Sequence, residues 1–220
     1  RDIAFAAFAF GGLQSLFAGF FILYLIDGLN YSEAQSGSIY AIASFSAIFA
    51  RIAWGVGGGV ISPRLILGLI GLTGALSALG LTQISASWNV FEVTVIAVLY
   101  NMTAISWHGI LLAEIARLAP KEQVGAVTGG VLSFTSVAMM IYPAIYGFLL
   151  ATTGSYRVGF LLGAIPSFAA FLIFIRAPVQ GPWGTALASS IRDQLQWRPA
   201  LIATMVLTTG VAIGWMTYWN

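Results

Sequence analysis

Long apolar stretches separated by short polar turns make up most of this chain. Each stretch is long enough to cross about 30 Å of hydrocarbon as an α-helix. The pattern therefore predicts an all-α, polytopic transmembrane helical bundle. The expected spans are residues 3–26, 33–60, 63–82, 89–116, 122–150, 156–175 and 199–219.

The turns carry signals for where helices begin. Ser32 followed by Gln35 is the pattern of a capping box, and Ser62 before Pro63 places a capping hydroxyl ahead of a proline at the first helical position. Pro143 lies inside the fifth apolar stretch, where a missing N–H predicts a kink.

The pattern changes after the sixth stretch. Residues 177–184 contain two prolines and two glycines, which is typical of a linker. Apolar residues then recur at every fourth position, which favours an amphipathic helix lying at the cytoplasmic surface; an ordinary solvated linker helix is the alternative. The expected organisation is a bundle over 1–176, a cytoplasmic linker over 177–198 and a seventh span over 199–220. The apolar positions are Trp183, Leu187, Ile191 and Leu195.

Composition supports a membrane protein and excludes several other classes. Only 7% of the 220 residues are charged, against about 25% in a typical soluble domain. The net charge of +2 gives no basis for nucleic-acid binding, and the absence of cysteine removes thiolate metal sites. No metal site and no cofactor are expected.

The basic residues predict the orientation of the chain. If the N-terminus is cytoplasmic, Arg157 is the one basic residue on the far side. We therefore expect an integral protein of a bacterial-type plasma (inner) membrane with a cytoplasmic N-terminus. The basic residues on the near side are Arg1, Arg51, Arg64, Arg117, Lys121, Arg176, Arg192 and Arg198.

The fourth span carries a polar patch near its middle. Polar groups at this depth are unfavourable unless they face a bundle interior or a wet cavity. His108 is the sole histidine and titrates near neutrality, as a proton-coupling group would. Packing between helices is the alternative role. The substrate or coupling candidates are Gln14, Asn101, Trp107 and His108.

Three charged residues form a second candidate set. Arg51 lies about 27 Å along the second span, near the cytoplasmic boundary. Glu114 and Arg117 are three residues apart and share one face of the fourth span. A cluster of the three would be a gate latch that forms in one conformation and breaks in another; side chains reaching separately to the interface are the alternative.

Small residues four apart suggest close helix packing, as in Gly55/Gly59, Gly125/Gly129 and Gly159/Gly163. The glycine run at 55–59 lacks the lysine of a phosphate-binding loop and is interpreted as a helix end. The sequence contains no paired carboxylates at mid-membrane and no nucleophile motif, so nothing in it indicates an enzyme.

Three segments resemble the major facilitator superfamily over residues 3–176. The loop after the second span is similar to that family's G-x-x-x-D-R-x-x-R signature, with Gly59 in place of the aspartate. The other two segments resemble the fourth helix, and the fifth helix with the following turn, of a C-terminal half. The segments are residues 51–64 with Gly55, Gly59 and Arg64, residues 107–120, and residues 125–160.

The resemblance implies a six-helix half built of inverted three-helix repeats, a central cavity, alternating access and proton coupling. Expected partners are a small-molecule substrate, protons, the lipid bilayer and the other half of the same polypeptide. The C-terminal half with an added segment is favoured; an N-terminal half followed by the central loop and seventh helix is the alternative.

The expected function is secondary active transport of a small solute, as symporter or antiporter, by what we take to be part of a longer polypeptide. An organic anion or a drug-like molecule is the suggested solute. One rival is a non-transporting receptor or assembly protein on the same scaffold, for which the atypical Gly59 leaves room. An intramembrane enzyme is a second and weaker rival.

Overall fold

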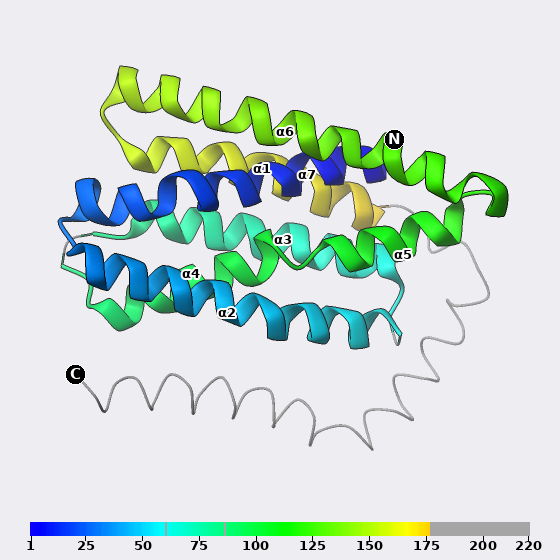
Figure 1. Ribbon diagram of the computed structural model, residues 1–220, viewed down its shortest axis with the longest axis horizontal. Coiled ribbons are helices and arrows are strands. Elements are labelled where there is room, and N and C mark those ends of the chain that lie inside the picture. Colours follow the sequence, from blue (N-terminus) through cyan, green and yellow to red (C-terminus); the bar gives the residue numbers. More distant parts are fainter. Residues whose placement is uncertain (60, 86, 177–220) are drawn as a thin grey trace. The chain divides into compact units, whose positions relative to one another are not determined.

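A computed structural model describes residues 1–59, 61–85 and 87–176, and the expected linker and seventh span lie outside them. The described chain is a bundle of long helices running along one axis (Figure 1). In chain order the elements are α1 (Asp2–Leu23), the π-helical turn η1 (Tyr24–Gly28), α2 (Glu33–Gly58), α3 (Pro63–Gln83), α4 (Val90–Ala104), α5 (His108–Leu118), the 3₁₀ turn η2 (Lys121–Gln123), α6 (Val124–Thr153) and α7 (Tyr156–Arg176).

Six helical segments of the described chain are long and apolar enough to cross a membrane. They confirm the first six expected spans. Three spans are composite. The turn η1 extends α1 to Gly28, α4 and α5 together make up Val90–Leu118, and η2 precedes α6 in Lys121–Thr153.

Local capping chemistry sets several helix starts. Ser32 and Gln35 form the expected reciprocal capping box at α2, and Ser62 accepts a hydrogen bond from the Leu65 N–H at the start of α3. Asn89 and Glu92 form a second capping box at α4, which was not predicted. Gly154 ends α6 with φ of 65°, a left-handed conformation that glycine adopts without strain.

The helices pair in a pattern expected of inverted repeats. The most extensive pairings are α3 with α7, α1 with α6, and α2 with α4. Suppose that α1 is exchanged with α4/α5, α2 with α6, and α3 with α7. The pair of α1 and α6 then becomes the pair of α4 and α2, and the pair of α3 and α7 is unchanged. This symmetry is the one that two three-helix repeats related by a pseudo-two-fold axis produce.

The first helix runs through the core of the bundle. Phe17 of α1 stacks on Tyr100 of α4 and on Tyr40 of α2, with ring centroids 5.4 and 5.3 Å apart. The Tyr100 hydroxyl donates a hydrogen bond of 2.9 Å to the Leu13 carbonyl. A buried tyrosine with a satisfied hydroxyl fixes α4 against α1.

Close helix contact occurs at some glycines and not at others. A Cβ at Gly71 of α3 would lie 2.7 Å from the Ser167 carbonyl oxygen of α7, and one at Gly159 would overlap the Tyr146 ring. Gly55, Gly125 and Gly129 have open space on the side where a Cβ would lie. Of the three expected glycine pairs, the one at Gly159/Gly163 therefore lies at a helix contact.

Large apolar side chains lie exposed on the outside of the bundle, with α2 and α6 among the helices that carry them. The examples with the greatest exposure on α2 and α6 are Phe45, Ile52, Met140 and Phe148, which are 61%, 56%, 77% and 67% exposed. Lipid or further helices can cover such faces in a membrane. Pro143 lies within α6, which continues unbroken from Val124 to Thr153, so the kink there stays a prediction.

Candidate functional site

The fourth span is broken at its polar patch. α4 ends at Ala104, α5 begins at His108, and the three residues between them form a turn. Figure 1 shows α5 continuing in the direction of α4 beyond this point. The fourth span expected over 89–116 is thus present as one membrane-length segment, with an interruption that was not predicted.

Polar side chains next to the break compete for the carbonyl groups that a continuous helix would use. The Ser106 hydroxyl donates to the Met102 carbonyl, and the Trp107 indole donates to the Ala104 carbonyl over 2.9 Å. Back-bonding of this kind bends or interrupts helices. A serine and a tryptophan thus supply the break that proline or glycine usually provides.

The neighbouring helix α2 contributes two further donors. Trp54 donates its indole N–H to the Met102 carbonyl over 3.2 Å. The Arg51 Nη2 makes a long hydrogen bond of 3.5 Å to the Ile105 carbonyl, and the His108 Nδ1 lies 3.2 Å from the same oxygen. Side chains from two helices therefore satisfy the carbonyl end of the break, as buried irregular backbone in a membrane requires.

Buried aromatic and polar groups surround this turn. Trp107 is fully buried and stacks on the half-buried His108 ring, with centroids 3.8 Å apart. Asn101 is fully buried one turn earlier, and neither of its amide atoms has a hydrogen-bond partner among the described residues. The same holds for Gln14 Oε1 of α1 and the Tyr142 hydroxyl of α6. Tyr142 is an addition to the candidates from the sequence.

Such unpartnered groups are uncommon. An unsatisfied buried polar group costs about 1–3 kcal/mol, so each one calls for an explanation. Three of the four substrate or coupling candidates lie at the break or one turn before it: Asn101, Trp107 and His108. Gln14 lies on α1, which packs against α4.

The charged residues group differently from the expected cluster. Glu114 is fully buried and accepts two hydrogen bonds of 2.8 Å from Arg117. Arg51 makes no ion pair with either residue and reaches the break instead. The structure thus brings together two of the three predicted members.

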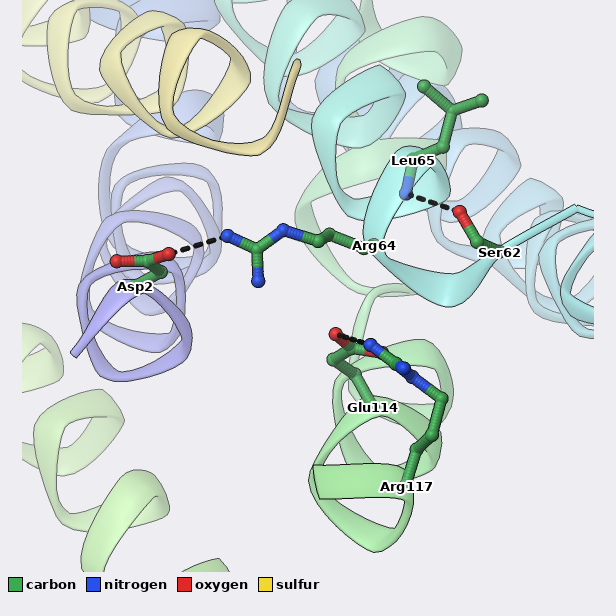
Figure 2. Close-up of polar contacts among 6 residues, drawn as sticks. All are labelled: Asp2, Ser62, Arg64, Leu65, Glu114 and Arg117. Atoms are coloured by element: carbon green, nitrogen blue, oxygen red, sulfur yellow. Dashed lines mark hydrogen bonds and ion pairs between the residues drawn. The ribbon is translucent and has the colours of Figure 1, made fainter. Parts of the chain in front are cut away.

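A second ion pair lies near the first. Figure 2 shows Arg64 of α3 directed at Asp2 of α1, with the Glu114–Arg117 pair on α5 beside them. The Arg64 Nη2 lies 2.5 Å from an Asp2 carboxylate oxygen, and its guanidinium lies over the Phe174 ring at 5.1 Å. Asp2 was not among the predicted site residues, although Asp2 and Arg64 are at the same expected end of their spans.

The loop motif contributes Arg64 to this ion pair, whereas its glycines end α2. Gly59 caps α2 with φ of −78°, an ordinary right-handed conformation. The glycine run is therefore a helix end, as expected. Among the described residues, no three His, Cys, Asp or Glu side chains come close enough to hold a metal ion.

Comparison with known proteins identifies the family. The family model described as Major Facilitator Superfamily matches residues 3–219. A search of curated proteins and a search of solved structures each gave no match. The matched range covers nearly the whole chain, in agreement with the six membrane-length helices and their repeat-like pairing. The chain therefore belongs to the Major Facilitator Superfamily, whose members are membrane transporters of small molecules.

Proposed function

We propose that this chain is part of a secondary active transporter that moves a small solute by alternating access, with protons as the coupling ion. Membership of the family supports membrane transport in general. The finer statements rest on the broken fourth span.

The break between α4 and α5 is the observation that carries the proposal. Transporter sites are often built where a membrane helix is interrupted, because the ends of the two half-helices can then bind solutes and ions. Here the interruption coincides with the polar patch of Asn101 and His108. A helix serving only as packing would have no evident reason to place unpartnered amide atoms beside a break.

His108 is the candidate coupling group. Its Nδ1 is directed at the Ile105 carbonyl, and its ring is half-buried against Trp107. An imidazole changes its charge near neutral pH, so proton binding there would alter the electrostatics of the break. Gln14 and Trp107 complete the proposed substrate region.

The charged residues near the ends of α1, α3 and α5 are proposed as part of the cytoplasmic gate. Asp2, Arg64, Glu114 and Arg117 form two ion pairs there, each of which can break and re-form during a conformational change. This placement assumes the cytoplasmic N-terminus predicted from the basic residues, in a bacterial-type inner membrane.

The other half of the transporter is the proposed partner of the exposed apolar faces on α2 and α6. The family match continues through residues 177–219, which supports assigning the linker and seventh apolar stretch to the same transporter chain. For residues 1–176 the proposed identity is the C-terminal half, and the N-terminal half is the alternative. A non-transporting receptor on this scaffold is the rival, supported by Gly59 in place of the family's aspartate.

Cysteine labelling tests the proposal, since this chain contains no cysteine. The variants are His108→Cys and Asn101→Cys in the full-length chain without other cysteines, and Ser87→Cys in an exposed turn is the control. A membrane-impermeant thiol reagent should label position 108, and position 101 more slowly because Asn101 is fully buried. Labelling at 87 alone would mean that the patch is packed and would contradict a water-filled pathway beside it.

A further inference from the structure

The C-terminus of α4 and the N-terminus of α5, which meet at the break, differ in the hydrogen bonds they receive from side chains. The carbonyl end of α4 receives donors from Trp54, Trp107, Ser106, His108 and Arg51. The N-terminus of α5, by contrast, has no side-chain capping hydrogen bond. The negative pole of α4 is therefore compensated, while the positive pole of α5 remains free to attract an anion.

Two side chains meet in the turn between the two poles. Arg51 and His108 approach the same oxygen, the carbonyl of Ile105, at 3.5 and 3.2 Å. That single long contact is the one hydrogen bond of Arg51 to the described residues, so most of its five N–H donors remain available.

Arg51, the arginine of the second span, has no carboxylate partner among the described residues. In the described part of the chain, Asp2 pairs with Arg64 and Glu114 pairs with Arg117. Glu92 is engaged in the capping box of α4, and Asp27 accepts a hydrogen bond from Tyr156. An arginine inside a membrane span normally pairs with an acidic group or a cavity ligand.

The Arg51 side chain acts well inside the length of both helices. Arg51 lies seven residues before the end of α2, about 10 Å from that end. Its guanidinium reaches Ile105, which is thirteen residues, or about 20 Å, from the end of α5 at Leu118. The exposed Arg51 side chain is therefore at the level of the break rather than at the end of either helix.

The first turn of α5 is open on one side. Gly109 is exposed, and a Cβ placed on it would meet no other atom within 4 Å. The partly exposed rings of Trp54 and His108 border the turn with aromatic surface. This combination suits a molecule with one negative group and an apolar or planar body.

We propose that the break between α4 and α5 is an anion-binding site that selects small organic anions as the substrate class. Arg51 binds the carboxylate with two parallel N–H donors, and the first-turn N–H groups of α5 add further positive potential. The inference rests on the proposed transport function and specifies its substrate.

The test measures electrostatic selectivity and needs no knowledge of the natural substrate. Gly109→Cys is introduced into the full-length, otherwise cysteine-free transporter in liposomes. Its labelling rates with an anionic sulfonatoethyl and a cationic trimethylammonioethyl thiosulfonate are compared. After normalisation to a free small thiol, the anionic reagent should react faster, and Arg51→Gln should lower this preference about fivefold, as expected for removal of a unit charge several ångströms away.

Two matched variants serve as controls for the effect of Arg51→Gln. Arg157 also donates from Nη2 to a carbonyl, that of Ile84 in another part of the bundle, so Arg157→Gln should leave the preference at position 109 unchanged. Arg51→Lys keeps the charge and should retain most of the preference, which separates loss of charge from misfolding.

Three results would overturn the proposal. They are a preference for the cationic reagent, a preference that Arg51→Gln does not change, and a position 109 that reacts with neither reagent. If position 108 is labelled in the earlier experiment while position 109 shows no anion preference, transport stands and the anion site fails. If neither position is labelled, the pathway itself is contradicted.

Discussion

Arg51 of α2 and His108 of α5 direct nitrogen atoms at one oxygen, the carbonyl of Ile105. The two residues are far apart in sequence and lie on different helices. Their meeting point is the turn that interrupts the fourth span, so this turn is held from both sides. A change in either side chain is therefore expected to alter the geometry of the break.

Trp54→Phe tests whether α2 stabilises the break. The substitution removes the indole donor from the Met102 carbonyl but keeps an aromatic ring. We expect a loss of about 1 kcal/mol, the usual net value of one hydrogen bond, seen as a lower melting temperature in detergent. Trp88→Phe is the matched control, because the Trp88 indole donates no hydrogen bond to any of the described residues; an equal effect at both positions would contradict the role of Trp54.

Asn101→Leu tests the unpartnered amide. A buried amide without partners destabilises the fold, so an apolar side chain of similar size should raise the melting temperature, by the equivalent of about 1 kcal/mol. The same change should abolish solute uptake if Asn101 contacts substrate. A variant that is both less stable and fully active would mean that the amide serves packing alone.

Glu114→Gln tests the buried ion pair. Glu114 is fully buried while Arg117 is 41% exposed, so solvent screening limits the net loss to about 1 kcal/mol. Arg117→Gln should be more damaging, because it leaves a buried carboxylate without its partner. Glu122→Gln, at an exposed position, should have no measurable effect on the melting temperature.

Gly71→Ala tests the contact between α3 and α7. The added methyl group would lie 2.7 Å from the Ser167 carbonyl oxygen and 2.9 Å from the Phe171 nitrogen, both of which belong to rigid helix backbone. Overpacking of this kind destabilises by about 1–3 kcal/mol. Gly130→Ala, which has open space inside α6, should instead be neutral or stabilising; similar losses at both glycines would argue against this close approach.

Features governed by neighbouring residues were predictable from the sequence. The capping box of Ser32 and Gln35 and the proline start at Pro63 depend on contacts within one turn. The capping box of Asn89 and Glu92 follows the same spacing and could have been predicted in the same way. The number and order of the first six spans follow from hydropathy alone.

Features governed by tertiary contacts were not predictable. The break at residues 105–107 contains neither proline nor glycine, and it depends partly on donors from α2. Arg51 was expected beside Glu114 because both were placed near the cytoplasmic end, but its hydrogen bond is to the Ile105 carbonyl at the break. The Asp2–Arg64 pair requires knowledge that α1 and α3 come together there.

Alternating access at the break is tested most directly by labelling His108→Cys from each side of the membrane. Sealed right-side-out and inside-out vesicles containing the full-length protein would be treated with the same impermeant thiol reagent. The account predicts labelling in both preparations, since a transport pathway opens to each side in turn. Labelling in neither preparation, with an exposed control cysteine reacting normally, would contradict it.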